Sequence, residues 1–319
     1  DYDVDGISAS AILIKYFESV GVNVSSFMPN RYEDGYGLNI NTLDKIFEKD
    51  IPNIIITVDC GITSVEEVEY IKSKGIDIVA TDPHERAEQL PNCLIINPKV
   101  SETYPFKSLC GAGVALKLVQ ALAGITKASE YFPICAIATI ADIVELFDEN
   151  RAIVALGLRN IDKAPAGVLK LMHEGGISKN CKASDIAFKL APKINASGRM
   201  ADATVAVKML LSKNNLEAFN YAKVLDEQNV LRQEVEKKID INNWEKVYQD
   251  LYSPKTEKQA KIANAKIAEL NKERAAIQAD KNMTFTEKTL KTKAIDKQLE
   301  YFNKQKDSFS DLTELVNDI

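Results

Sequence analysis

Short apolar runs alternate along the first hundred residues with segments whose apolar positions recur every three or four residues. Residues 54–58, 76–81 and 94–96 are rich in β-branched side chains, as is typical of strands buried on both faces of a parallel sheet. Residues 65–74, between the first two runs, have helical spacing. Alternating strands and helices with short connections predict right-handed crossovers, and therefore an α/β fold with a parallel, doubly wound sheet and flanking helices.

The same periodicity predicts helices at residues 7–20 and near 43–47, with a short strand at 22–27 between them. From Cys110 onward the pattern is mostly helical, and apolar helices are expected at 114–122 and 134–140.

Beyond residue 215 the sequence changes character, because a long charged helical pattern begins there and aliphatic residues become scarce after 242. We therefore predict a core at 1–214, a long connecting helix at 215–241 and a charged helical hairpin or coiled-coil tail at 242–319. The residues that suggest the tail are at heptad spacing or in a capping box: Ala263, Leu270, Ile277, Thr284 and Glu287.

Composition narrows the class of protein. The chain has 319 residues, of which 45% are hydrophobic, and a formal net charge of −6, which argues against a protein held to nucleic acid or membranes by bulk charge. Its five cysteines lack CxxC spacing, so neither a zinc site nor a disulfide framework is indicated. No apolar stretch approaches the ~20 residues that span a bilayer, and no signal peptide precedes the first motif, so we expect a cytoplasmic protein.

Three carboxylates at alternate positions open the chain: Asp1, Asp3 and Asp5. In an extended segment these side chains would share one side, where a cation would be needed to stabilise their like charges. Hard oxygen ligands favour Mg²⁺ or Mn²⁺, and a nearby imidazole favours Mn²⁺. A solvated acidic N-terminus is the alternative explanation of these residues.

Three later aspartates favour the metal site. Asp59 and Asp82 each follow a predicted strand, at the carboxyl end where open α/β sheets bind ligands. Asp142 interrupts an apolar stretch, either as a further ligand or as the cap of a helix. Because the chain begins directly on the acidic motif, we also expect that a first strand is missing, so that all three segments would meet at one edge of the sheet.

Residues 192–199 combine small side chains with one guanidinium. We predict a loop in which Ser197 and Arg199 approach a phosphate closely. The start of an ordinary helix is the alternative.

Taken in order, these segments resemble the motifs of the DHH phosphoesterase superfamily and, within it, of the RecJ-type single-strand exonucleases. The resemblance extends over residues 1 to about 240. The segments that carry it are Asp1–Gly6, Val58–Gly61, Thr81–His84 and Ala141–Val144, with support from Pro29–Gly37, Cys110–Ala115 and Asn195–Arg199.

The resemblance implies a pair of Mn²⁺ or Mg²⁺ ions, which would supply a nucleophile and neutralise charge on the phosphate. The implied ligands are Asp3, Asp5, Asp59 and Asp142, with Asp1 and Asp82 as auxiliary groups.

The resemblance also implies catalytic roles for Asp59 and His84, and His84 would contact phosphate. Arg31 would read a 5′-phosphate, and Arg199 would grip the backbone. The expected function is a metal-dependent 5′→3′ exonuclease that hydrolyses single-stranded DNA in repair and recombination.

Two features depart from the family pattern. Pro83 stands where the family has a ligating histidine, and proline cannot coordinate a metal through its side chain. We therefore expect reduced activity, with the second metal held weakly or with His84 or Glu85 shifted inward. The family's second, nucleic-acid-binding domain is also expected after the long helix, and its Gly-rich, His-containing motif is absent from this sequence.

Two other functions stay open. Pro83 and the absent domain also fit an inactive DHH-fold scaffold that binds a replication or repair protein through the C-terminal helices. Hydrolysis of short oligonucleotides or cyclic dinucleotides is a third possibility, which Arg31 and its loop disfavour.

Overall fold

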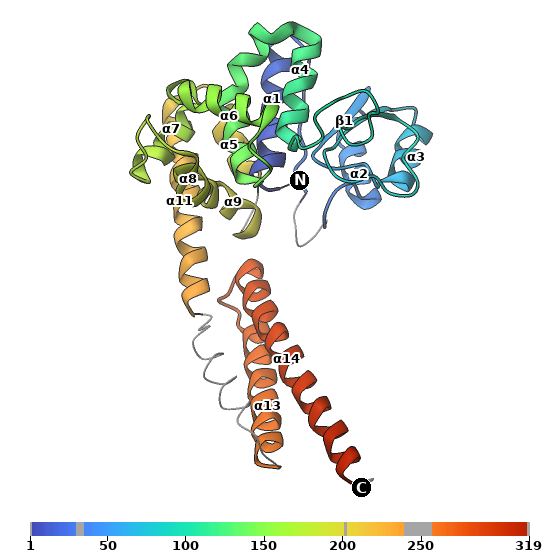
Figure 1. Ribbon diagram of the computed structural model, residues 1–319, viewed down its shortest axis with the longest axis vertical. Helices are drawn as coiled ribbons and strands as arrows, with labels where there is room; N and C mark the ends of the chain where they lie inside the picture. The colour runs from blue at the N-terminus through green and yellow to red at the C-terminus, as the bar shows by residue number, and fades with distance from the viewer. Residues whose placement is uncertain (1, 30–34, 201–202, 239–256, 318–319) are drawn as a thin grey trace. The chain divides into compact units, whose positions relative to one another are not determined.

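The computed structural model describes residues 2–29, 35–200, 203–238 and 257–317 (Figure 1). The chain divides into two compact units, Asp1–Val230 and Leu231–Ile319. The predicted functional residues all fall in the first unit.

The first unit contains a parallel sheet. Its strands are β1 (Ile54–Val58), β2 (Asp77–Thr81) and β3 (Leu94–Ile96), in the order β1-β2-β3. In the register, Ile54 lies opposite Asp77, and Val79 lies opposite Leu94. The predicted α/β class with a parallel sheet is confirmed.

Both faces of this sheet are covered. On one face, a small core includes side chains of α2 (Ile40–Phe47) and α3 (Val65–Ser73), and Ile55 of β1 packs against it. Ile56 and Val58 pack instead against the larger core of the unit, because successive residues of a strand point to opposite faces. Because both faces are covered, most residues of the three strands are apolar.

Helices build the larger core. The buried helix α1 (Val4–Ser19) packs against α4 (Gly111–Ala128), α5 (Phe132–Ala141) and α10 (Thr204–Leu211). Figure 1 shows α1 and α4 side by side. The other helical segments of this unit are η1 (Ser129–Tyr131), α6 (Asp148–Arg159), η2 (Ile161–Lys163), α7 (Ala166–Glu174), α8 (Ala183–Asp185), η3 (Ile186–Leu190) and α9 (Ala191–Met200).

The long helix α11 (Asn215–Lys238) begins in the first unit and ends in the second. In the second unit, α13 (Glu257–Ala279) packs on α14 (Phe285–Asn317). At the start of α14, the Glu287 amide donates to Thr284 Oγ1, and the Thr284 amide donates to the Glu287 carboxylate. The side chains buried between the two helices are Leu270, Ile277, Ile295 and Phe302.

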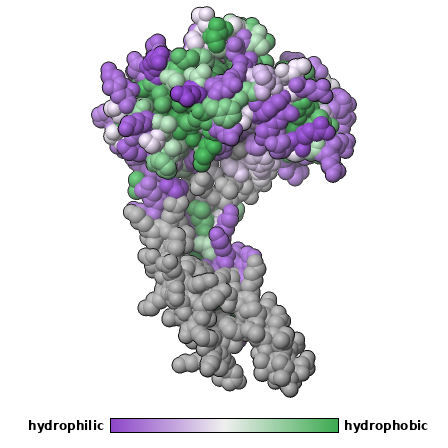
Figure 2. Space-filling model, in the orientation of Figure 1, coloured by the Kyte–Doolittle hydropathy of each residue, from purple (hydrophilic) through white to green (hydrophobic). Residues whose placement is uncertain are grey.

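The surface of the first unit is mixed. Figure 2 shows hydrophobic side chains among hydrophilic ones over its helices. Among the described residues, no helix has both the length and the apolar composition needed to cross a bilayer.

Two predicted local structures are wrong. Residues 22–27 form no strand, and these residues pair with none of the three strands of the sheet. Residues 192–199 form no loop, because they lie within α9. The small residues there serve packing: a Cβ on Gly198 would lie 2.2 Å from the carbonyl oxygen of Tyr2.

A similar close contact joins α5 and α6, and it gives a test of the fold. A Cβ on Gly157 would lie 2.4 Å from the carbonyl oxygen of Phe132 and 2.4 Å from the Cβ of Ala136. We expect Gly157→Ala to lower the free energy of unfolding by about 1 to 3 kcal/mol, because α6 must move away from α5. Urea unfolding of the full chain measures this.

The matched control is Ala155→Val, which adds volume on the exposed side of the same helix. It should change the free energy of unfolding by less than about 0.5 kcal/mol. Equal effects of the two substitutions would contradict the packing described for α5 and α6.

Candidate metal centre

The acidic motif at the start of the chain forms the beginning of a helix. Asp3 is the N-cap of α1, and its Oδ1 accepts hydrogen bonds from the amides of Asp5 (2.9 Å) and Gly6 (3.0 Å). The expectation of an extended segment with its carboxylates on one side is therefore wrong, since capping fixes the turn instead. The cap still holds the side chains of Asp3 and Asp5 near each other at the positive end of the helix dipole.

Asp5 joins the start of α1 to the start of α4. Its buried carboxylate accepts hydrogen bonds from the amides of Gly111 (2.5 Å) and Ala112 (2.8 Å). Burial raises the pKa of Asp5 and the charge of Asp3 raises it further, although the two amides oppose this. Because each carboxylate oxygen has a second lone pair, Asp5 can still ligate a cation.

Asp59 occupies the turn directly after β1. Its backbone is left-handed, with φ of 59°, a conformation that aspartate tolerates better than most residues. Its amide donates to the carbonyl of Thr81 (2.9 Å), so the position of the turn is fixed by the neighbouring strand. A Cβ on Gly111 would lie 2.6 Å from the Cβ of Asp59, so α4 can approach this turn only with glycine there.

The carboxyl group of Asp59 is strongly perturbed. Its pKa is raised to about 10, first by burial and then by the charges of Asp5 and Asp3. A carboxyl group in this state is unstable when ionised, and a nearby cation would stabilise it.

Asp82, after β2, holds His84 in place. Its Oδ1 accepts from His84 Nδ1 and from the His84 amide, both at 2.8 Å, and its Oδ2 accepts from the amide of Ile62. Burial opposes ionisation of Asp82, but these hydrogen bonds outweigh it and lower its pKa. The pKa of His84 is raised, chiefly by its hydrogen bond to Asp82. Nδ1 of the ring therefore carries a proton, and in the imidazolium form, which the raised pKa favours, Nε2 carries one as well.

Asp142 is the C-cap of α5, and it is followed by a strained residue. Ile143 has φ of 59°, which costs a β-branched residue about 1–2 kcal/mol. A carboxylate at the negative end of a helix gains nothing from the helix dipole, so the capping explanation of Asp142 is weak. Although Asp142 is open to solvent on one side, desolvation, then the charges of Asp5 and Asp3, raise its pKa to about 7.

The electrostatics and donor types of this cluster fit a hard divalent cation. Burial first, and then the charge of one another or of Asp3, raises the pKa of Asp5, Asp59 and Asp142, and their oxygens are the ligands that Mg²⁺ and Mn²⁺ prefer. Within the part of the chain that the structure describes, no three His, Cys, Asp or Glu side chains converge closely enough to hold one ion.

The proline at position 83 leaves His84 as the imidazole nearest the carboxylates. His84 Nδ1 lies 4.0 Å from Asp59 Oδ1, and its side chain is 53% exposed. Glu85, the other residue expected to replace the missing ligand, instead pairs with Lys99 at 2.9 Å.

The predicted phosphate-binding residues have different surroundings. Ser197 is fully buried and donates to the carbonyl of Ile194 (2.8 Å), so a phosphate cannot reach its hydroxyl in this structure. Asp1 and Arg31 lie outside the described residues, as does the side chain of Arg199.

Three residues that sequence reasoning did not single out also shape the site. Tyr36 donates its hydroxyl to the carbonyl of Asp59 (3.0 Å), and Asn195 accepts from the amide of Val4 (2.9 Å). Asn97 donates to the carbonyl of His84 (2.9 Å). A signal for Asn97 was present, because it follows β3 as Asp59 and Asp82 follow their strands.

The raised pKa of Asp59 predicts how stability depends on pH. Because folding raises this pKa from 3.8 to about 10, the ionised unfolded state is favoured increasingly as pH rises between those values. In EDTA at pH 8, Asp59→Asn should raise the free energy of unfolding by roughly 2 kcal/mol. The loss of stability between pH 5 and pH 9 should also be smaller than in the wild type, as measured by urea unfolding.

Asp77→Asn, at an exposed position on β2, is the control and should leave this pH dependence unchanged. If Asp59→Asn instead lowered stability at pH 8, Asp59 would not be a repelled, buried carboxyl group.

Comparison with known proteins places this geometry in a family. Residues 1–144 match the family described as DHH family, N-terminal domain. The chain is 38% identical over 243 residues to the single-stranded-DNA-specific exonuclease RecJ of Bacillus subtilis. The match covers 75% of this chain and 31% of that protein. The chain is 34% identical over 239 residues to the single-stranded-DNA-specific exonuclease RecJ of Thermus thermophilus. That match covers 74% of this chain and 35% of that protein.

A solved structure agrees with these matches. A crystal structure of exonuclease RecJ bound to manganese superposes with a TM-score of 0.70 at 33% identity, covering 75% of this chain and 62% of that chain. The chain spans about a third of the length of the two curated relatives. By its sequence and by its fold, the chain belongs to the DHH family, with residues 1–144 as the family's N-terminal domain.

Proposed function

We propose that this chain is a metal-dependent 5′→3′ exonuclease acting on single-stranded DNA. The observation that carries the proposal is the set of repelling carboxylates at the edge of the sheet, with pKa values raised by burial and by one another's charge. Relatives of 34–38% identity are named single-stranded-DNA-specific exonucleases, which supports DNA as the substrate.

We propose Asp3, Asp5, Asp59 and Asp142 as the ligands of Mn²⁺ or Mg²⁺. A metal bound there would lower the pKa of a water molecule and neutralise charge on the phosphodiester. Related RecJ structures bound to manganese and to magnesium support either ion.

The residues of the chain supply orientation and a proton donor. Asp82 fixes Nδ1 of His84, so the exposed Nε2 edge of the ring can donate to a phosphate oxygen. The raised pKa of His84 keeps more of the ring protonated near neutral pH, which favours this contact. Asn97 and Pro83 restrict the backbone on either side of that ring.

The proposal also includes the direction of digestion and the recognition of the 5′ end of the substrate. Arg31 is our candidate for binding a 5′-phosphate, because a guanidinium binds phosphate oxygens in pairs. We place the reaction in the cytoplasm, where the DNA is, with the helices of the second unit available to a protein partner.

A labelled oligonucleotide tests this proposal. With Mn²⁺, the full chain should release mononucleotides stepwise from the 5′ end of a 5′-phosphorylated single strand, and a duplex should resist. Asp59→Ala should lower the rate at least ~1,000-fold, and His84→Ala should lower it about 100- to 10,000-fold, as expected for a lost proton donor.

Asp77→Ala serves as the control and should retain the wild-type rate. Absence of hydrolysis at every metal concentration, with the protein folded, would contradict the proposal and favour the noncatalytic scaffold. Activity that survives Asp59→Ala would point to a contaminating nuclease.

Position 83 allows a gain-of-function test. An imidazole at this position would lie beside Asp82 and add a nitrogen ligand, so Pro83→His should lower the Mn²⁺ concentration for half-maximal activity severalfold. Mn²⁺ titration followed by electron paramagnetic resonance measures binding separately from activity. Unchanged Mn²⁺ affinity in a folded Pro83→His protein would show that this position does not limit metal binding.

A further inference from the structure

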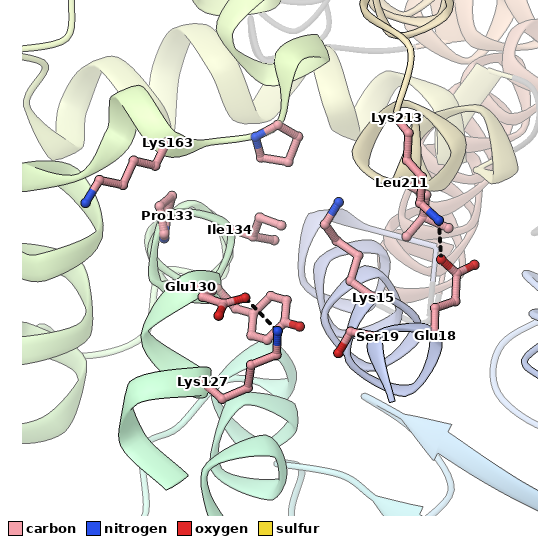
Figure 3. Close-up of a pocket in the computed structure, with 12 residues that line it drawn as sticks. Lys15, Glu18, Ser19, Lys127, Glu130, Pro133, Ile134, Lys163, Leu211 and Lys213 are labelled. Atoms are coloured by element: carbon pink, nitrogen blue, oxygen red, sulfur yellow. Dashed lines mark hydrogen bonds and ion pairs between the residues drawn. The ribbon is translucent and has the colours of Figure 1, made fainter. Parts of the chain in front are cut away.

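A cavity of about 350 Å³ opens at the far end of α1 from the carboxylate cluster. Its lining comes from α1, α4, η1, α5, η2, α10 and the loops that follow η2 and α10 (Figure 3). Because Ser19 lies fourteen residues after Asp5 along α1, the cavity is roughly 20 Å from the acidic site. It is therefore separate from the candidate metal centre.

Lysines dominate the charge of this cavity. Four lysines and two glutamates line it, which leaves a net charge of about +2 in a chain whose formal net charge is −6. Both glutamates are already paired: Glu130 with Lys127 at 2.8 Å, and Glu18 with Lys213 at 3.2 Å. The lining lysines without such a pair among the described residues are Lys15 and Lys163.

Lys15 is the cation best placed to meet a ligand. Its ammonium group donates to the carbonyl of Leu210 (3.2 Å), which leaves two N–H donors. Figure 3 shows this group pointing into the cavity, whereas the ammonium group of Lys163 points away, and Lys163 donates to Asn160. Burial lowers the pKa of Lys15, as expected for a cation that lacks a partner anion.

The two ion pairs beside Lys15 could open at little cost. Exposed pairs of this kind contribute about 0–1 kcal/mol, and the side chain of Lys213 is 87% exposed. An anion with two charges, bound at Lys15, could therefore recruit Lys127 and Lys213 from either side. A single carboxylate would match this surplus of positive charge less well.

The remaining wall of the cavity is apolar. Its apolar residues are Pro133, Ile134, Pro165 and Leu211, and Ser19 and Tyr131 add a hydroxyl group each. An apolar wall beside one cluster of charge is the usual composition of a small-molecule site, and the volume lies at the lower end of the range for such sites. A ligand with a phosphate at one end and a flat, weakly polar group at the other would use both parts.

We propose that this cavity binds a nucleoside monophosphate, with the phosphate on Lys15 and the base against the proline and leucine side chains. The site does not depend on the proposed nuclease activity, since none of the residues that line it belongs to the carboxylate cluster.

Calorimetric titration of the full chain in EDTA tests this proposal without metal. The probes are deoxythymidine 5′-monophosphate, thymidine and inorganic phosphate. We expect the monophosphate to bind, and thymidine to bind at least tenfold more weakly because it lacks the phosphate. Lys15→Met keeps the apolar stem of the side chain and should weaken monophosphate binding at least tenfold.

Lys127→Gln/Lys213→Gln gives a second test at exposed positions that do not endanger folding, and should weaken binding severalfold. Its matched control is Lys189→Gln/Lys223→Gln, which removes the same charge from exposed lysines outside the cavity. That control and Asp59→Asn should both retain wild-type affinity.

Equal binding of phosphate and monophosphate, both lost in Lys15→Met, would keep the phosphate site but identify free phosphate as its ligand. The proposal is overturned if no probe binds at millimolar concentration, or if affinity is the same in folded Lys15→Met. Loss of binding in Asp59→Asn would instead place the ligand at the carboxylate cluster.

Discussion

The burial of two aspartates against the first turn of α4 is the constraint on which the rest of this structure depends. Asp5 accepts hydrogen bonds from the Gly111 and Ala112 amides, and the Cβ of Asp59 lies where a side chain on Gly111 would be. The sheet and the helical core therefore meet at a point of concentrated negative charge. Hydrophobic packing on both sides holds these groups together, and their mutual repulsion is what makes the site suited to a cation.

Around that point, hydrogen bonds position the turns and side chains of the site. The Asp59 amide is bonded to β2 and the Asp82 amide to β3, so the positions of both turns follow from the sheet. Asp82 then orients His84, whose backbone carbonyl is held by Asn97. This arrangement shows how a histidine can remain beside the carboxylates although its neighbour is Pro83.

The two ends of α1 have opposite electrostatic character. Asp3 and Asp5 lie at its N-terminal end, where the helix dipole favours negative charge, and Lys15 lies toward its C-terminal end, before the last turn. The same buried helix thus links an acidic site at the sheet edge to a basic cavity in the helical core. Both are places where a charge without a full partner is kept inside the protein.

The sequence by itself determined the class of fold, and it predicted an acidic site. Strongly periodic segments predicted the parallel sheet and most of the helices, and aspartates at strand ends predicted where the carboxylates would gather, because both depend on local pattern. Tertiary structure alone decided how those groups are held. Asp5 accepts from the Gly111 amide, Asn195 accepts from the Val4 amide, and Gly111 packs against Asp59. These outcomes depend on residues about 50 to 190 positions apart packing together, and no local pattern encodes such contacts. The lysine-lined cavity could not be predicted from the sequence either, because its lining comes from segments scattered between Lys15 and Lys213.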